Sequence, residues 1–433
     1  MREFLWGAAT SSHQIEGYND KNDWWEWELK GNIEGNARSG AATDHLNRFR
    51  EDIKLAADLG LNSYRFSIEW SRLEPQEGQW SDEAFGWYKD LLSECEKHKL
   101  KPMLTLHHFT SPNWFAKRGG FTAPDAPNYF CEFVKRVIHE LGPRIPLWCT
   151  FNEPMVLLVG SYLGKFMPPA EFSPLKFSQA CQGILKSHQQ AYELIHNQPL
   201  RSGPWKDNPI QVGIAHNLID FYADRHWHPL ELLFTKLLRK FYNQAWLDAI
   251  TGGAINFRIP GFIPGPKPAV SITPKGCADF IGINYYTKAY VKWRPRDKAE
   301  GISPDFPVGI AFSRRKEPTS EVGWAIHPKG LGRMLRFASH YKLPIYITEN
   351  GIADKVDKMR EAYLTSHLAQ VTLAIEGGID VRGYYHWSLL DNFEWIKGFG
   401  PRFGLYEVNY ETFERKLRNS GKFLKKTILE SSK

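Results

Sequence analysis

The sequence predicts an α/β fold in which residues 1–433 form a single (β/α)8 (TIM) barrel with elaborated loops at the carboxyl ends of its strands. Helix-period segments alternate with short strand-like runs along the whole chain. The strand-like runs number eight, and most are apolar throughout, as expected of parallel strands buried on both faces. The length of 433 residues suits one such barrel with insertions.

The predicted strands are short and rich in β-branched and aromatic residues. They span residues 4–9, 63–68, 102–107, 147–151, 210–215, 279–286, 345–348 and 381–388. Helices with an apolar period close to 3.6 are predicted over residues 85–95, 130–141, 178–196, 331–341 and 363–375. A doubly wound sheet with a second domain is the alternative fold. No GxGxxG follows the first strand and no GxxxxGK[ST] occurs, so nucleotide-binding loops are not indicated.

The composition is that of a globular chain without a nucleic-acid or membrane partner. The net charge is +7, from 55 basic and 48 acidic residues, which is mild for this length. No run of about 18 apolar residues occurs, and the stretch MREFLWGAAT lacks the layout of a signal peptide. The five cysteines are widely spaced, which favours reduced thiols over disulfides or a zinc site. We therefore expect a cytoplasmic protein.

Polar and aromatic residues follow the predicted strands at the points where the strands end. In a barrel the carboxyl ends of all eight strands meet at one face, where the active sites of such barrels lie. The residues that this brings together are Gln14, Arg65, Glu69, His107, His108, Asn152, Glu153, Asn284, Tyr286, Glu349, Trp387, Asp391, Glu394 and Trp395. His107 and His108 are adjacent on one strand and point to opposite faces, so we expect no metal site there.

Glu153 and Glu349 are carboxylates that directly follow apolar strands. Taken alone, Glu349 with Asn350-Gly351 reads as the tip of a hairpin, because Asn-Gly is a strong turn signal. At the end of the seventh barrel strand, Glu349 would instead face the common site, and Asn-Gly would start the outgoing loop. Two carboxylates that flank a sugar are what glycosidic cleavage needs, one as proton donor and the other as nucleophile or activator of water.

The environments of two such carboxylates must hold their pKa values apart. Arg65 and a Tyr286 hydroxyl would favour an ionised neighbour, whereas an apolar setting would keep the partner protonated. The 16 Trp, 18 Tyr and 27 Phe are compatible with a sugar site, because flat aromatic faces stack on the C–H faces of sugars.

Several longer motifs carry a resemblance to one enzyme family. They are FLWGAATSSHQIEG (4–17), YRFSIEWSRLEP (64–75), TFNEP (150–154), GINYYT (282–287), EVGW (321–324), YITENG (346–351), YYHWSLLDNFEW (384–395) and RFGLYEV (402–408). Together and in this order, they resemble the motifs of the glycoside hydrolase family 1 β-glycosidases, the β-glucosidase family, almost from end to end. The resemblance implies a retaining double displacement, with Glu349 as the nucleophile and Glu153 as the acid/base.

The resemblance also implies which residues bind substrate. It places Tyr286 and Arg65 beside the nucleophile, and it places Trp324 of EVGW on the leaving-group side. The residues implied for the glycone are Gln14, His108, Asn152, Trp387, Glu394 and Trp395, and we group Asn284 with them as a substrate-binding candidate. No metal or cofactor is implied. Phe109 departs from the family pattern, because many members have Trp beside the histidine, and residues 201–274 match the family poorly.

The expected activity is that of a retaining exo-β-glycosidase. A β-glucosidase is expected first, acting on terminal non-reducing β-D-glucosyl residues, and also on β-galactosyl or β-fucosyl residues, of small glycosides or short oligosaccharides. A 6-phospho-β-glycosidase of the same family is an alternative. Such members lack the glutamate at the position of Glu394, whereas here DNFEW is intact and its carboxylate would repel phosphate, although Lys397 is a contrary signal.

Two further alternatives concern the outcome of the chemistry. A transglycosidase would use the same residues and pass the glycosyl group to an alcohol instead of water. A non-catalytic sugar-binding relative would usually have lost a catalytic carboxylate, whereas both Glu153 and Glu349 are present.

Overall fold

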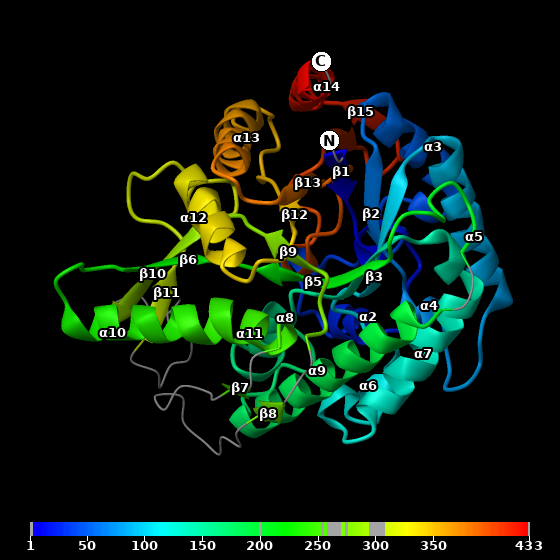
Figure 1. Ribbon diagram of the computed structural model, residues 1–433, viewed down its shortest axis with the longest axis horizontal. Coiled ribbons are helices and arrows are strands. Elements are labelled where there is room, and N and C mark those ends of the chain that lie inside the picture. The colour runs from blue at the N-terminus through cyan, green and yellow to red at the C-terminus, as the bar shows by residue number, and fades with distance from the viewer. Residues whose placement is uncertain are drawn as a thin grey trace.

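Eight parallel strands close into a barrel in the computed structural model of the chain, which describes residues 3–198, 201–252, 255–257, 270–272, 276–293 and 308–431 (Figure 1). Around the barrel the strand order is β1-β13-β12-β9-β5-β4-β3-β2. The strands are β1 (Leu5–Ala9), β2 (Ser63–Ser67), β3 (Lys101–His107), β4 (Leu147–Asn152), β5 (Gln211–Asn217), β9 (Phe280–Asn284), β12 (Ile345–Asn350) and β13 (Val381–Trp387). All eight predicted strands are therefore confirmed, and the barrel replaces the doubly wound alternative.

Long helices surround the strands (Figure 1). They are α3 (His45–Asp58), α5 (Asp82–Lys97), α7 (Ala126–Glu140), α9 (Pro174–His196), α12 (Pro328–Ser339), α13 (Arg360–Glu376) and α14 (Asn419–Ser431). The five predicted helices correspond to α5, α7, α9, α12 and α13, each beginning a few residues earlier than its apolar period. Capping explains the earlier starts of α5 and α9, because Ser81 accepts a hydrogen bond from the Ala84 amide and Ser173 accepts one from the Lys176 amide.

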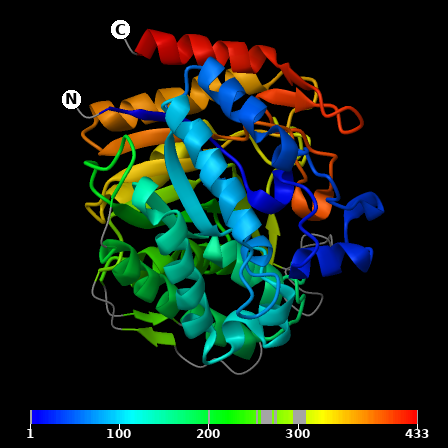
Figure 2. The same cartoon turned by 90° about the vertical axis from the view of Figure 1, so that its right-hand side faces the viewer.

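Short elements lie between the barrel strands and the long helices. They include α1 (Ser12–Ile15), α2 (Asp23–Leu29), α4 (Trp70–Leu73), α6 (Asn113–Lys117) and α8 (Pro154–Tyr162), the 3-10 turns η1 (Glu34–Asn36), η2 (Gly120–Thr122), η3 (Gly142–Arg144) and η6 (Trp395–Lys397), and the hairpin of β14 (Tyr406–Val408) with β15 (Arg415–Leu417). The chain termini lie on the same side of the molecule, with α14 above the end of β1 (Figure 2).

The largest insertions follow β5 and β9. A three-stranded sheet is formed by β6 (Asp220–Ala223), β10 (Lys288–Trp293) and β11 (Val308–Ala311). Beside it run α10 (Pro229–Leu238), the π-helix η4 (Arg239–Gln244) and α11 (Ala245–Ile250), at the left and bottom of Figure 1. A short pair, β7 (Ile255–Phe257) and β8 (Val270–Ile272), follows. Most of the poorly matched segment 201–274 folds into these insertions, and its residues 253–254, 258–269 and 273–274 lie outside the described part.

Two apolar layers hold the barrel together. The larger one fills the space between strands and helices, and it includes Phe66, Trp148 and Ile347. The smaller one fills the barrel interior with Leu5, Ala9, Met103, Leu147, Cys149, Ala215, Phe280, Tyr346, Tyr385 and Trp387. Because successive strand residues point to opposite sides, one apolar run feeds both layers. All five cysteines are free and buried, and no helix in the described part of the chain is long and apolar enough to cross a bilayer.

Candidate active site

Glu349 lies near the end of β12, with each of its carboxylate oxygens held by a separate donor. The Arg65 guanidinium, from β2, donates to Oε1 at 2.5 Å, and the Tyr286 hydroxyl donates to Oε2 at 2.6 Å. Glu349 is 3% exposed and Arg65 is fully buried. A charge-assisted pair of this kind, reinforced by a hydroxyl, holds the carboxylate in one orientation at the mouth of the barrel.

Glu153 immediately follows β4, and its backbone has the left-handed values φ 43° and ψ 56°. This is a sparsely populated conformation for a residue with a side chain, and such residues cluster at functional sites. The Oε1 atom accepts hydrogen bonds from Asn284 Nδ2 at 2.9 Å and Asn217 Nδ2 at 3.2 Å. Burial, and then the negative charge of Glu349, raise the pKa of Glu153 to about 8. At neutral pH, Glu153 therefore carries a proton.

Two amides connect the surroundings of the two glutamates. The side-chain oxygen Oδ1 of Asn152 accepts from Arg65 Nη2 at 2.8 Å and from Asn284 Nδ2 at 3.1 Å. Arg65 thus contacts both Glu349 and Asn152, and Asn284 contacts both Asn152 and Glu153. Strand pairing explains this proximity, because Asn284 on β9 is the register partner of Glu349 on β12. Residues far apart in the sequence therefore meet at one face of the barrel, as predicted.

The pairing between strands becomes irregular just before each glutamate, in β4 before Glu153 and in β12 before Glu349. The pairing of β4 with β5 shifts between Cys149 and Asn152, and the pairing of β12 with β9 shifts between Ile347 and Glu349. Such irregularities re-aim side chains and occur beside active sites.

An aromatic wall, formed by His108, Trp387 and Trp395, lies next to Asn152. The His108 ring is stacked with the rings of both Trp387 and Trp395, at centroid distances of 6.0 Å and 6.1 Å. The His108 Nε2 atom contacts the Asn152 amide at 3.1 Å. Burial, and then the charge of Arg65, hold the pKa of His108 well below its usual range, so its ring is neutral.

Gln14 and Glu394 complete this wall. Gln14 is fully buried, and its amide nitrogen donates to Asn392 Oδ1 and to the Phe393 carbonyl, both at 2.8 Å. The Trp387 indole donates to Glu394 Oε1 at 3.2 Å. Removal of the Glu394 carboxyl from water raises its pKa to about 8.

Trp324 is half-buried beside Tyr286, the hydroxyl partner of Glu349, with its ring 5.6 Å from that of Tyr286. A small hollow next to them is lined by both rings together with Ser320 and Ile352. Trp324 therefore lies at the mouth of the barrel. It contacts Tyr286, which holds Oε2 of Glu349, whereas Arg65 holds Oε1. The residues that the family resemblance implied for the site, other than Gln14, are thus linked to one another by these contacts, and Gln14 bonds to the two loop residues that precede Glu394.

Three residues near the strand ends have other surroundings. Glu69 is fully buried and accepts hydrogen bonds from Ser12 and Ser71, and Asp391 is likewise buried among arginines. His107 contacts the Ser111 hydroxyl at 3.1 Å and packs on Phe121 and Phe151 of the outer apolar layer, on the opposite side of the strand from His108. Within the described residues, no group of three or more His, Cys, Asp or Glu side chains is arranged to hold a metal ion.

The interpretation of Asn350-Gly351 as the start of the outgoing loop needs correction for Asn350. This residue is still part of β12, and its amide donates to the Tyr285 carbonyl at 2.6 Å and the Tyr363 hydroxyl at 2.9 Å. Gly351 does not have a positive φ; it is required by close packing, since a Cβ there would lie 1.8 Å from the Trp387 carbonyl oxygen. Asn350 therefore continues the strand, and Gly351 leaves it without the left-handed backbone of a tight turn.

Asn217 was missed by the sequence prediction. The fifth predicted strand stops at residue 215, whereas β5 extends to Asn217, the register partner of Asn284. The available signal was a polar residue two positions beyond an apolar run, because Glu153 has the same position relative to the run 147–151.

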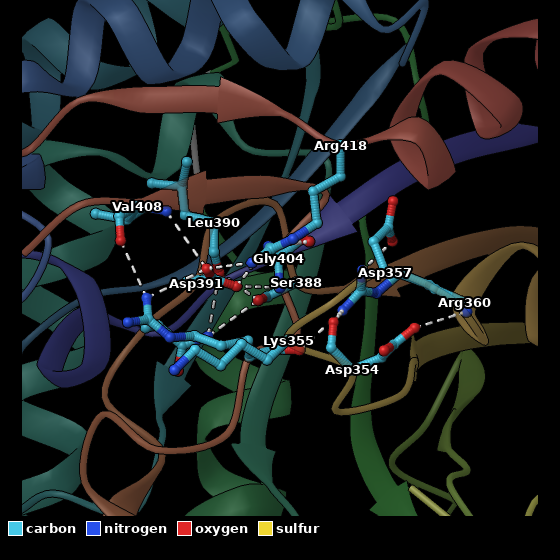
Figure 3. A network of polar contacts seen from close by, with 12 residues as sticks. Asp354, Lys355, Asp357, Arg360, Ser388, Leu390, Asp391, Gly404, Val408 and Arg418 are labelled. Carbon is cyan, nitrogen blue, oxygen red and sulfur yellow. Dashed lines mark hydrogen bonds and ion pairs between the residues drawn. The ribbon is translucent and has the colours of Figure 1, made fainter. Parts of the chain in front are cut away.

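A buried ion-pair network supports the loops that follow β12 and β13 (Figure 3). Arg418 makes two hydrogen bonds to Asp391, one to each oxygen, both at 2.8 Å, and Arg402 contacts the same carboxylate at 3.3 Å. Arg360 contacts Asp357 and donates to the Arg402 carbonyl at 2.8 Å. The network joins α13 and the start of α14 to the loop that carries Glu394.

Replacing Asp391 by Asn is expected to lower the free energy of unfolding by about 3 to 5 kcal/mol, because Arg418 would keep a buried positive charge without its counter-ion. Denaturant unfolding of the two proteins measures the difference. The matched control is Asp58→Asn, which removes the exposed ion pair with Lys54 and should change stability by less than about 0.5 kcal/mol. Equal effects of the two substitutions would contradict a structural role for the network.

Comparison with known proteins agrees with this geometry. The sequence profile described as Glycosyl hydrolase family 1 matches residues 1–432. The chain is 32% identical over 455 aligned positions to β-glucosidase A of Acetivibrio thermocellus, with 99% of this chain and 97% of that protein covered.

Solved structures agree as well. A β-glycosidase from Pyrococcus horikoshii has a TM-score of 0.85 and 39% identity, with 98% of this chain and 93% of that chain covered. A β-glucosidase from Thermotoga maritima in complex with castanospermine also has a TM-score of 0.85, with 26% identity and coverage of 99% and 98%. Because the family profile spans almost the whole chain, the chain belongs to glycosyl hydrolase family 1 and is a glycosidase.

Proposed function

We propose that this chain acts as a retaining exo-β-glycosidase, foremost a β-glucosidase, and that residues 1–433 form one catalytic domain. The observation that carries this proposal is the pair Glu153 and Glu349, which lie at one barrel mouth in opposite settings. Glu349 accepts from a guanidinium and a phenol, whereas burial raises the pKa of Glu153 to about 8. Divergent environments of two carboxyl groups assign the acid and the nucleophile.

The proposed reaction has two steps. In the first, Glu349 attacks the anomeric carbon as Glu153 gives its proton to the glycosidic oxygen, so that the bond to the leaving group breaks and a glycosyl ester forms. In the second, Glu153 takes a proton from water, which attacks the anomeric carbon and releases Glu349. Two inversions retain the β configuration. Neither step requires a metal or a cofactor, because both proton transfers use Glu153.

The side chains around the two glutamates are proposed to bind the glycone. Asn152 bonds to Arg65 and Asn284, the partners of the two glutamates, and is suited to the 2-hydroxyl, while the wall of His108, Trp387 and Trp395 is suited to the sugar face. The outer hydroxyls are assigned to Gln14 and Glu394, Asn284 is assigned to the same pocket, and Trp324 is assigned to the leaving-group side.

The charges near the pocket favour an unphosphorylated sugar. Glu394 contacts the Trp387 indole inside the wall and, with its pKa raised to about 8, is mostly protonated at neutral pH, so it offers a phosphate no positive charge, and once ionised it would repel one. Lys397, the contrary signal in the sequence, forms an exposed ion pair with Glu34 at 3.0 Å. The buried, unpaired thiols of the five cysteines support the proposed cytoplasmic location.

A substrate panel tests this proposal. p-Nitrophenyl β-D-glucoside, β-D-galactoside and β-D-fucoside should all be hydrolysed, and the glucoside should exceed its 6-phosphate by about 10-fold or more in kcat/KM, because a phosphate that is taken out of water beside Glu394 gains no cation to compensate it. Product analysis with an added alcohol separates hydrolysis from transglycosylation. A preference for the 6-phosphate would overturn the assigned substrate, and absence of any turnover would overturn the assigned reaction.

A further inference from the structure

Asn217 contacts Glu153 but belongs to none of the motifs that carry the family resemblance. It ends β5, directly opposite Asn284 in the register of β5 with β9. Its Nδ2 atom donates to Glu153 Oε1 at 3.2 Å, beside the 2.9 Å bond that Asn284 Nδ2 makes to the same oxygen. Two neighbouring strands therefore direct two amide donors at one oxygen of one carboxyl group.

The orientation of Asn217 is set by Tyr242. The Tyr242 hydroxyl donates to Asn217 Oδ1 at 2.9 Å, which requires the amide nitrogen of Asn217 to face Glu153. Burial, and then the charge of Glu153, hold the pKa of Tyr242 well above its usual range, so the hydroxyl stays a donor. Without this bond, the Tyr242 hydroxyl would no longer fix whether the oxygen or the nitrogen of the Asn217 amide faces Glu153.

Tyr242 lies in the π-helix η4, between α10 and α11. Single π-helical turns inside α-helices occur frequently at functional sites. This turn is attached to the end of β5 and the start of β6: the Tyr242 carbonyl contacts His216 Nε2 at 3.0 Å, and the Asn243 side chain makes two hydrogen bonds to the backbone of Ile219, at 2.7 Å and 3.1 Å. The irregular turn thus brings the Tyr242 hydroxyl to the strand end that bears Asn217.

The two donors restrict where Glu153 can carry its proton. An Oε1 atom that accepts two N–H groups leaves no room for a hydrogen of its own, because that hydrogen would face both donors. The proton must then reside on Oε2. We propose that Asn217, oriented by Tyr242, is a positioning residue that keeps the acidic proton of Glu153 on Oε2 and thereby aims it at the leaving-group oxygen.

This inference rests on the proposed function, and the test separates the two. Wild type and Glu153→Ala are first assayed with phenyl β-D-glucoside, a poor leaving group, and 2,4-dinitrophenyl β-D-glucoside, which needs little acid assistance. A larger loss on the phenyl substrate establishes Glu153 as the acid independently of Asn217. Failure at this stage would overturn the proposed function and, with it, the positioning role.

Asn217→Ala should then lower kcat/KM about 10- to 100-fold on phenyl β-D-glucoside and less than about 3-fold on the dinitrophenyl substrate, because acid catalysis as a whole is worth about 10²- to 10⁴-fold. Tyr242→Phe should act in the same direction, by about 3- to 10-fold, since it removes only the bond that orients Asn217. Loss of a donor to the charged form should also move the alkaline limb of kcat/KM to higher pH.

The matched control is Tyr192→Phe, which removes a tyrosine hydrogen bond of 2.9 Å to Asp279, just before the amino end of β9 and so at the opposite end of that strand from the site. It should leave both rate constants and the pH profile unchanged. An equal loss on both substrates would show a merely structural role for Asn217, and a higher KM with an unchanged kcat would show direct binding of the leaving group. An unchanged leaving-group dependence in both Asn217→Ala and Tyr242→Phe would also overturn the positioning role.

Discussion

Glu349→Gln is expected to lower kcat by at least about 10⁴-fold, because the covalent intermediate can no longer form and loss of a nucleophile typically costs that much or more. The amide is nearly isosteric: its oxygen can still accept from Arg65 and its NH2 can donate to the Tyr286 oxygen, so the fold should be kept. Steady-state hydrolysis of p-nitrophenyl β-D-glucoside measures the loss, and thermal unfolding verifies that the variant is folded.

A buried glutamate elsewhere supplies the control for this variant. Glu231 on α10 is 1% exposed and pairs with Arg225 at 2.8 Å, outside the site. Glu231→Gln therefore removes a comparable buried charge and should leave kcat within about 2-fold of wild type, as expected for a residue without transition-state contacts. Wild-type turnover by Glu349→Gln would refute its role as the nucleophile.

Glu153→Ala is expected to produce the second large effect, which depends on the leaving group. On phenyl β-D-glucoside, kcat/KM should fall about 10²- to 10⁴-fold, the range that general acid catalysis supplies. On 2,4-dinitrophenyl β-D-glucoside, the first step needs little acid, so kcat/KM should be nearly retained while kcat falls because water lacks its base. Added azide needs no base and should restore kcat, giving β-glucosyl azide.

The pH profile provides an independent measure of the same role. Burial and the neighbouring Glu349 raise the pKa of Glu153 to about 8, so the protonated form persists through neutral pH and is lost as the pH rises through that value. The alkaline limb of kcat/KM in the wild type should therefore have its midpoint at about pH 8. It should disappear in Glu153→Ala, and its persistence there would assign the limb to another group.

The fold was predictable because the strands and helices of the barrel produce patterns that can be recognised in short stretches of the sequence. Strands that are buried on both faces appear as continuous apolar runs such as residues 147–151, and β4 was found within one residue of its end. Helices were found by their apolar face but began earlier than predicted, since the first turn depends on caps such as Ser81 and Ser173.

The details of the site were less predictable for a physical reason. Asn217 was missed because it lies beyond an apolar run, and its role depends on Tyr242, which a π-helical turn brings to it. Asn350-Gly351 signalled a turn, yet the glycine is required by the close approach of the Trp387 carbonyl from the neighbouring strand. Neither contact has a counterpart in the local sequence pattern.

The sequence by itself determined the eight-stranded barrel, the placement of Glu153 and Glu349 at strand ends, and the family motifs around them. Only the tertiary structure decided which oxygen of each carboxyl group accepts from which donor. It also decided that the pKa of Glu153 is raised to about 8. The physical reason is that apolar periodicity is a property of adjacent residues, whereas burial and charge pairing arise between residues such as Arg65 and Glu349, 284 positions apart.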